Sequence, residues 1–302
     1  MPPRNVGDAA PADQRYLARP VLVRVLLIAM VAGLFGPAAA PAQQRPLRTE
    51  DPTPIPAGAI LVELGVDVEI DRRFPLSGLE GDLYRLPYLG FSFGLGNVAE
   101  FQIDAGFNLV HVKDRDPAPL TENLDFTGDT TTDIEDPVIA TKLRLLRETR
   151  RAPAVALRVA TRIPSASNES GIGTDTIDWF MTVLAGKTLG DLRVVANFGL
   201  GVLPFPQQGD RQNDVLTGGL SLAWRHPGGA ELVGEVNGRI DVMGETPVGI
   251  EDRGQFRLGA RWPLGDFLGG QVRLDGGVLV GLTDVEPEVG VTVGLTAITR
   301  SF

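Results

Sequence analysis

The stretch GTDTIDWFMTVLAGKTLGDLRVVANFGLGVL, Gly173–Leu203, holds two apolar runs that meet at Leu189–Asp191. In the second run every other residue is apolar: Leu192, Val194, Ala196, Phe198, Leu200 and Val202. The positions between them are Arg193, Val195, Asn197, Gly199 and Gly201. Because successive side chains of a strand point to opposite faces, this pattern predicts a hairpin with one apolar and one polar or small face. The apolar face covers either a protein core or a lipid bilayer, and the two cases imply different functions.

The same two-residue period continues along the rest of the chain from Ala59 onward, where no amphipathic helix is evident. The pattern predicts twelve strands, and the short interruption at Pro87 leaves the phase of the second one ambiguous. The predicted strands are Ile60–Ile70, Leu83–Gly94, Glu100–Val112, Val138–Leu146, Ala154–Ile163, Ile177–Lys187, Leu192–Val202, Val215–Arg225, Glu231–Val242, Gln255–Trp262, Gln271–Leu282 and Glu288–Thr299.

The links between these strands are sorted by length. Short turns follow the even-numbered strands, at 94–97, 147–153, 189–191, 226–229 and 264–269. Longer links follow the odd-numbered strands, at 113–137, 164–176, 203–214 and 243–253, whereas 71–81 is intermediate and 283–287 is short. An even number of strands with short turns at one end and long loops at the other is typical of outer-membrane β-barrels. The sequence therefore predicts an all-β antiparallel transmembrane barrel of about twelve strands, and a soluble β-sandwich is the weaker alternative.

The polar faces of the predicted strands carry charges of both signs on neighbouring strands, which suits a confined lumen better than an exposed sheet face. Two interpretations stay open: the charges create a transverse field that orients a permeating solute, or they pair with one another to fill a narrow lumen. The candidate lumen-lining residues are Lys142, Arg144, Arg158, Arg162, Asp178, Arg193, Glu231, Glu235, Arg239, Arg257, Arg261, Arg273 and Asp275.

The three tryptophans lie near predicted strand ends. Trp224 and Trp262 share the apolar phase, and each comes directly before a short turn. Trp179 lies near a long link, at the opposite end of its strand. Aromatic side chains of transmembrane barrels form girdles at the two membrane interfaces. We therefore expect Trp224 and Trp262 in one girdle and Trp179 in the other.

The N-terminal segment predicts export. Arginines precede the apolar run Val25–Phe35, and Ala40–Ala42 supplies an A-x-A cleavage site, so residues 1–42 are expected to be a signal peptide. The Pro-rich residues 43–58 are expected to form an extended periplasmic leader, and residues 59–302 the barrel. Removing residues 1–42 takes four arginines and two aspartates from the 28 basic and 38 acidic side chains, which leaves a formal charge of −12. This charge argues against a nucleic-acid partner, and the absence of cysteine excludes disulfides.

The other polar motifs indicate neither a catalytic site nor a metal site. His226 sits in a turn, and no serine has the relation to His111 that a hydrolase would need, so we expect a non-catalytic protein without cofactor. The segment Asp114–Asp136 holds eight acidic residues and one arginine. The four-residue spacing of its aspartates does not match a calcium-binding EF-hand loop, so a solvated extracellular loop without metal is expected.

Residues Asp136–Leu203 carry the motifs KLRLL, RIPS, GTDTIDW and GKTLGDLRVVANFGL. On these motifs the chain resembles the outer-membrane barrel family of the meta-pathway phenol degradation type, which is distantly similar to fatty-acid and aromatic-hydrocarbon channels. The pair Ser165-Ala166 departs from the small Gly-bearing turn expected after Pro164. The resemblance implies an outer-membrane location and passage of hydrophobic or aromatic compounds.

Together these patterns predict a Gram-negative outer-membrane barrel for passive transport of a small, aromatic or hydrophobic solute. The alternative is a non-transporting barrel with a structural role or a surface-binding role through its acidic loops. The expected partners are outer-membrane lipid and lipopolysaccharide, the barrel-assembly machinery and the small-molecule solute.

Overall fold

The computed structural model of the protein describes residues 44–302, apart from 207, 243, 245–246, 268–269 and 300–302. Within this part of the chain the regular structure is thirteen strands and one short 3-10 helix, Thr121–Asn123. The strands are β1 Ile60–Phe74, β2 Leu79–Leu95, β3 Ala99–Arg115, β4 Thr130–Ile134, β5 Val138–Leu146, β6 Ala154–Arg162, β7 Asp178–Leu189, β8 Leu192–Phe205, β9 Gln208–Arg225, β10 Glu231–Asp241, β11 Arg253–Phe267, β12 Gly270–Gly281 and β13 Val289–Thr299.

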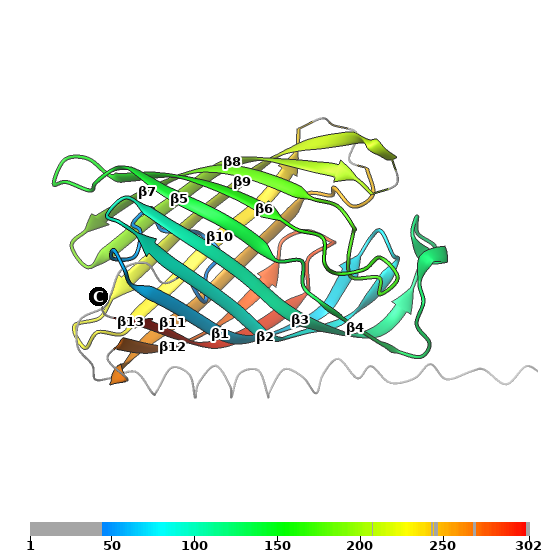
Figure 1. Ribbon diagram of the computed structural model, residues 1–302. Coiled ribbons are helices and arrows are strands. Elements are labelled where there is room, and N and C mark those ends of the chain that lie inside the picture. The colour runs from blue at the N-terminus through cyan, green and yellow to red at the C-terminus, as the bar shows by residue number, and fades with distance from the viewer. Residues whose placement is uncertain (1–43, 207, 243, 245–246, 268–269, 300–302) are drawn as a thin grey trace, which may run out of the picture. The chain divides into compact units, whose positions relative to one another are not determined.

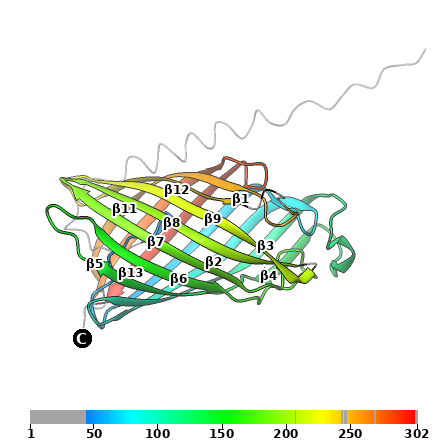
Figure 2. The ribbon, with the colours of Figure 1, turned by 90° about the horizontal axis from the view of Figure 1, so that it is seen from above.

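Twelve of the strands form a closed antiparallel ring. Each strand pairs with its neighbours along the chain, and the pairing of β1 with β13 closes the barrel. The strands run obliquely around the barrel, as Figures 1 and 2 show. The predicted all-β barrel of twelve strands is therefore confirmed.

The thirteenth strand, β4, lies outside the ring and was not predicted. It pairs with residues 107–111 of β3, whereas β5 pairs with residues 99–104 of the same strand. β3 therefore continues past the end of its pairing with β5, and β4 covers the backbone groups of that free edge. The run Thr130–Thr132 suits this position because β-branched residues favour extended backbone.

The hairpin of β7 and β8 turns its apolar face to the outside of the barrel. The apolar phase of β8 faces outward, with Phe198 62% exposed, whereas Val195 in the other phase is only 5% exposed. Large apolar side chains with similar exposure occur around the barrel, on β1, β7, β9, β10, β11 and β13. An outward apolar surface around a polar interior is the arrangement of a barrel that spans a bilayer.

Several strands are longer than predicted. The expected link 203–214 is mostly hairpin, since Leu203 pairs with Asn213 and Phe205 with Gln208. The expected link 71–81 likewise belongs to β1 and β2 except for residues 75–78. The prediction of loops at these two positions was wrong. Continued strand pairing satisfies the backbone N–H and C=O groups of these polar segments, and a periodicity of apolar residues does not detect it.

Two of the remaining long segments at this end of the barrel, 116–137 and 163–177, pack together. Leu79, Val110 and Val112 form a buried cluster, against which pack apolar side chains of both segments: Leu124, Phe126 and Ile172. The carboxylate of Asp136 accepts hydrogen bonds from the backbone N–H groups of Ser165 and Ala166 at 2.8 and 2.9 Å. The expectation of a solvated acidic loop was therefore wrong for Asp136, since burial beside these N–H groups gives its charge a structural role.

The predicted signal peptide, residues 1–42, lies outside the described residues. Among the residues that are described, no helix is long and apolar enough to cross a membrane.

The two ends of the barrel differ in the length of their links. The short-turn end carries the turns 96–98, 147–153, 190–191 and 226–230, and the long-loop end carries the segments 116–137, 163–177 and 242–252.

Candidate functional site

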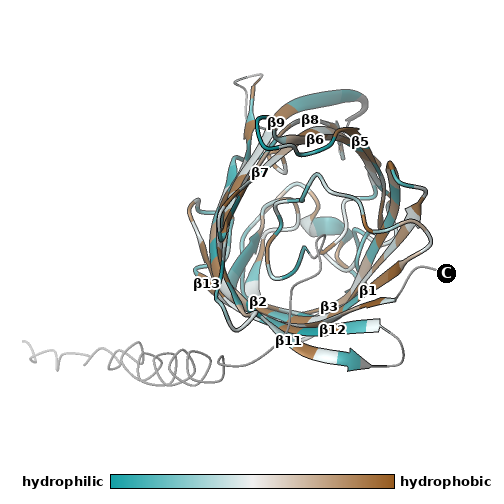
Figure 3. Cartoon of the chain, turned by 90° about the vertical axis from the view of Figure 1, so that its left-hand side faces the viewer, coloured by the Kyte–Doolittle hydropathy of each residue, from teal (hydrophilic) through white to brown (hydrophobic). Residues whose placement is uncertain are grey.

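Residues 44–58, the leader, lie inside the barrel. In the view along the barrel, chain segments cross the space within the ring of strands (Figure 3). Arg261 of β11 donates hydrogen bonds to the carbonyl oxygens of Gln44 and Arg45 at 2.9 and 2.7 Å. The sequence predicts these residues as an extended periplasmic leader rather than an element of the barrel, and the structure differs because polar groups of the inner wall satisfy the leader backbone.

Further along the leader, carboxylate and amide side chains of the wall hold its backbone. Glu235 of β10 accepts hydrogen bonds from the backbone N–H groups of Arg48 and Thr49, both at 2.7 Å. Asn197 of β8 accepts from the N–H of Glu50 at 2.8 Å and donates to its carbonyl oxygen at 2.9 Å. Charged and paired hydrogen bonds of this kind fix an extended segment that has no secondary structure of its own.

Arg45 anchors the start of the leader to β1 and β12. Its guanidinium forms ion pairs with Asp67 of β1 at 3.3 Å and Asp275 of β12 at 3.4 Å. A Cβ atom at either Gly65 of β1 or Gly294 of β13 would collide with this guanidinium. Glycine at these two inward positions is therefore needed for the close approach of Arg45.

A buried ion cluster holds the middle of the leader. Lys142 of β5 is 0% exposed, and its ammonium lies 2.6 Å from Glu50 and 3.2 Å from Glu100 of β3. Gln102 also donates to Glu50, at 3.0 Å. A lysine removed from water needs such carboxylate partners, because desolvation of an unpaired charge is costly.

The leader then returns to the short-turn end and continues into β1. Asp51 pairs with Arg193 of β8 at 2.9 Å, and the N–H of Ile55 donates to Glu100 at 2.8 Å. The backbone of Gly58 bonds to that of Gly94 at 2.9 Å, directly before β1 begins. The leader thus crosses the short-turn half of the lumen and contacts most of its wall.

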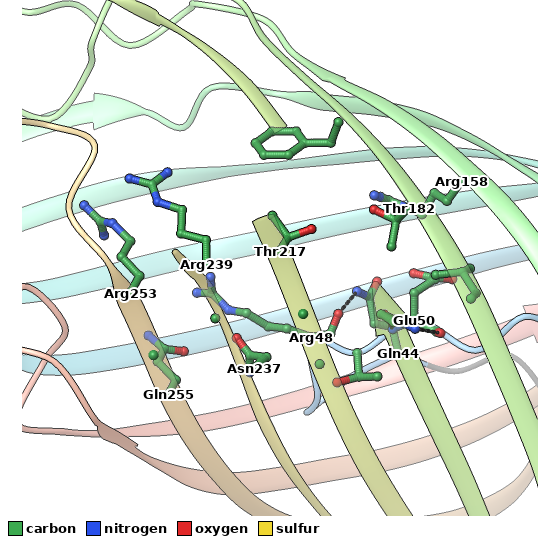
Figure 4. A pocket seen from close by; sticks show the side chains of 18 of the residues that line it. Gln44, Arg48, Glu50, Arg158, Thr182, Thr217, Asn237, Arg239, Arg253 and Gln255 are labelled. Carbon is green, nitrogen blue, oxygen red and sulfur yellow. Dashed lines mark hydrogen bonds between the residues drawn. The ribbon is translucent and has the colours of Figure 1, made fainter. Parts of the chain in front are cut away.

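Above the leader, toward the long loops, the lumen holds a cavity of about 390 Å³. Leader residues Gln44, Arg48, Thr49 and Glu50 line one side of it, and residues of β6 to β11 together with Glu286, from the link between β12 and β13, line the rest. Figure 4 shows Arg48, Arg239 and Arg253 reaching into this space from the leader, β10 and β11, with Arg158 of β6 on the facing wall. The volume lies near the lower end of the roughly 300–1,000 Å³ common for ligand pockets, so it suits one small molecule.

The cavity lining holds more guanidinium groups than carboxylates. The four arginines are Arg48, Arg158, Arg239 and Arg253, and the two acids are Glu50 and Glu286. Both acids already pair with cations, Glu50 with Lys142 at 2.6 Å and Glu286 with Arg72 at 2.7 Å. Positive charge is therefore in excess in this part of the lumen.

The candidate lumen residues predicted from the sequence fall into three groups. The leader contacts Lys142, Arg193, Glu235, Arg257, Arg261 and Asp275. Arg158 and Arg239 line the cavity. Away from both, Arg162 pairs with Asp178, Glu231 pairs with Arg225 and Arg261, Arg273 is buried, and Arg144 donates to the carbonyl oxygen of Asn97 in a short turn. Whether any of them contacts a solute stays a prediction.

The tryptophans occupy strand ends on the apolar phase. Trp224 of β9 and Trp262 of β11 lie at the short-turn end, and Trp179 of β7 lies at the long-loop end. Trp179 and Trp224 are 37% and 43% exposed, and Trp262 is partly buried. Their role as two membrane girdles stays a prediction.

Sequence reasoning missed the leader and the cavity residues Arg48, Arg253 and Glu286. A Pro-rich polar segment carries no periodicity, and Arg253 precedes the first residue of the strand predicted there. One signal was available: glycines interrupt the polar phase at positions such as Gly65, where a side chain would collide with the leader.

The histidines lie apart from the cavity. His226 is in the turn after β9, where its Nδ1 accepts a hydrogen bond from the N–H of Gly228 at 3.0 Å. His111 is exposed on β3 beside β4. In the described part of the chain no cluster of three or more acidic or histidine side chains could hold a metal. The expectations of a non-catalytic protein without cofactor or metal stay predictions.

Comparison with known proteins gives the fold. No family model matches the chain, and no curated protein matches it. Among solved structures, the COG4313 outer membrane channel from Pseudomonas putida F1 is similar with a TM-score of 0.58 and 13% identity, over 82% of this chain and 97% of that chain. At this identity the likeness shows a shared barrel fold, which agrees with the closed ring of strands described above.

Two further structures are less similar. The β domain of the Bordetella autotransporter BrkA has a TM-score of 0.41 and 12% identity, over 82% of this chain and all of that chain. The toluene transporter TodX of Pseudomonas putida has a TM-score of 0.36 and 9% identity, over 89% of this chain and all of that chain. The resemblance to the meta-pathway phenol degradation family stays a prediction.

Proposed function

We propose that this protein is an outer-membrane channel that passes a small solute passively through its lumen. The observation that carries the proposal is the closed twelve-stranded barrel with an apolar outer wall and a charged inner wall. A barrel of this kind satisfies all backbone groups internally and presents apolar side chains to lipid, so it is stable only across a membrane. The short-turn end is then periplasmic and the long-loop end extracellular.

The cavity supports passage rather than a purely structural role. A structural barrel gains nothing from an excess of guanidinium groups around an open volume of about 390 Å³, because like charges repel one another. The leader narrows the path on the periplasmic side, so the channel passes only small solutes, or it opens further when the leader moves. Following the sequence resemblance, we propose a solute with an aromatic or other apolar body.

Single-channel conductance in planar bilayers tests this function. The mature chain, refolded in detergent and shown to be a closed barrel by heat-modifiable migration on gels, should produce discrete conductance steps. If neither this chain nor a variant lacking residues 44–56 conducts, passage through the lumen is excluded, and the alternative of a structural or surface-binding barrel takes its place. Fractionation of the outer membrane tests the location separately.

A further inference from the structure

Two arginines face each other directly across neighbouring strands at the cavity. Arg239 of β10 and Arg253 of β11 are register partners at the long-loop end of this strand pair. Like charges placed directly opposite on an antiparallel pair are destabilising. The fold keeps this pair although neither arginine is needed to close the barrel, since the strand pairing itself is made by backbone groups.

The described chain gives the pair one carboxylate within ion-pair distance. Among the described residues, Arg239 donates to two loop carbonyl oxygens, those of Gly249 at 3.1 Å and Glu251 at 3.4 Å. Arg253 lies 3.5 Å from Glu286, which also pairs with Arg72 at 2.7 Å. Both arginines line the cavity, and the Nε of Arg253 has no hydrogen-bond partner among the described residues. The pair therefore presents charged donor groups to the cavity.

Two further guanidinium groups reach the same cavity. Arg158 donates to the side-chain oxygen of Gln102 at 2.8 Å and lines the cavity. Arg48 has one distant carboxylate, Glu69 at 3.8 Å, which Arg72 approaches to 3.1 Å. Figure 4 shows Arg48, Arg239 and Arg253 on one side of the space and Arg158 on the other.

The lining also offers an apolar surface. Phe180 and Leu184 of β7 line the cavity. Phe180 packs on the buried cluster that contains Ile250, and the residues on both sides of Ile250 supply the carbonyl oxygens that hold Arg239. The same loop thus contributes to the cluster behind Phe180 and to the hydrogen bonds of Arg239, and both side chains line the cavity.

We infer that this cavity binds a small organic carboxylate, whose carboxylate group takes hydrogen bonds from Arg239 and Arg253 and whose apolar body lies against Phe180 and Leu184. Guanidinium groups bind carboxylates through paired, charge-assisted hydrogen bonds. Arg48 and Arg158 add positive charge that attracts the anion from the extracellular side. The inference rests on the proposed channel function and names the chemical class of its solute.

Calorimetric titration of the detergent-refolded mature chain tests this site without requiring conductance. Benzoate is the probe, benzyl alcohol is its uncharged counterpart, and inorganic phosphate is an anion without an apolar body. We expect benzoate to bind and the other two to bind at least about tenfold more weakly, a difference of about 1.4 kcal/mol. Equal binding of benzyl alcohol would show a purely apolar site, and equal binding of phosphate a general anion site, and either result overturns the inference.

Substitutions locate the site. Arg239→Gln and Arg253→Gln should each weaken benzoate binding roughly tenfold, because each removes a charge-assisted hydrogen bond. Arg73→Gln is the matched control, since Arg73 also lies at the long-loop end but is exposed and pairs with Glu80 outside the cavity. If a strand variant does not fold, Arg48→Gln in the leader replaces it. Benzoate binding that none of these variants changes would exclude the cavity as the site.

The outcome can be separated from the channel function. If the protein conducts chloride but does not bind benzoate, the channel function is supported and the carboxylate site is rejected. If it binds benzoate in detergent but never conducts, the carboxylate site is supported and passive passage is rejected. In bilayers that conduct, millimolar benzoate should reduce the chloride current of the wild type and leave that of Arg239→Gln unchanged.

Discussion

The two halves of the lumen differ in how far their charged side chains are paired with opposite charges. In the short-turn half, the leader brings a partner to nearly every charged side chain that it meets, as with Lys142 between Glu50 and Glu100 and Arg193 beside Asp51. In the half toward the long loops, Arg239 and Arg253 face each other, and the one carboxylate of the described chain within ion-pair distance of them is Glu286, which also pairs with Arg72. Both halves are built from the same alternating strands.

The difference separates charges that hold the structure from charges that, on the proposed function, serve a ligand. Paired charges such as those of Lys142 lose their water but gain near neighbours of opposite sign, so removing one partner leaves the other uncompensated. Arg239 has no carboxylate within ion-pair distance in the described chain, so its replacement leaves no opposite charge without a partner. The pairing interpretation therefore describes the short-turn half, and a field that orients a solute stays a prediction for the other half.

Deletion of the leader should have the largest effect. Without residues 44–56 the short-turn half of the lumen loses the segment that fills it, so single-channel conductance should rise severalfold. The barrel itself should still form, because its closure depends on the pairing of β1 with β13. Heat-modifiable migration checks closure. An unchanged conductance would contradict the view that the leader limits the path.

Lys142→Met should cause the largest loss of stability among single substitutions. The change leaves Glu50 and Glu100 buried without their cation, and breaking a buried pair costs about 3–5 kcal/mol. The free energy of unfolding, measured by urea titration in lipid vesicles, checks this. Adding Glu50→Gln and Glu100→Gln should recover most of the loss, and no recovery would mean that packing rather than charge is responsible.

Glu235→Gln should weaken the hold on the leader without opening the barrel. The carboxylate accepts two backbone N–H groups at 2.7 Å, and hydrogen bonds to a charged group contribute about 1.5–3 kcal/mol. We expect more frequent opening events in single-channel records. Glu80→Gln, which changes a carboxylate outside the lumen, is the control. Equal gating in both variants would argue against Glu235 as a leader contact.

Arg239→Gln should change stability little, in contrast to Lys142→Met. The loss of two hydrogen bonds to loop carbonyl oxygens is offset by relief of repulsion from Arg253, so the free energy of unfolding should change by less than about 1.5 kcal/mol. The same urea titration checks both variants side by side. A loss as large as that of Lys142→Met would remove the distinction between the two halves.

The smallest expected effect is a pH dependence at the short-turn end. Partial burial acts to raise the pKa of Glu148, but the N–H of Thr188 and the Arg193 guanidinium outweigh it and hold the pKa below its usual value. A lowered pKa stabilises the folded state above the pKa of the unfolded chain, and this contribution is lost as pH falls below about 4. Because Glu148 is near the surface, the loss should be within about 1 kcal/mol. Glu148→Gln should remove this part of the pH dependence of unfolding.

Much of the fold could be predicted from the sequence because the relevant signals are local. The alternation in β8 is read from neighbouring residues, and the sorting of links by length follows from where each alternation stops. The same local logic failed for the link 203–214, where polar residues continue a strand pair beyond the apolar band. Apolar periodicity reports contact with lipid, and it does not report backbone pairing in water.

The sequence by itself determined a closed antiparallel barrel with an apolar outside and a charged inside, because a two-residue period and the length of links need no knowledge of distant contacts. Only the tertiary structure decided where the leader lies and which charges stay unpaired. Arg45 bonds to Thr292, 247 positions away, and Arg239 meets Arg253 only through the register of β10 and β11. The sequence around a charged side chain does not show whether an oppositely charged partner lies beside it in the folded chain, because that partner can come from a distant part of the sequence.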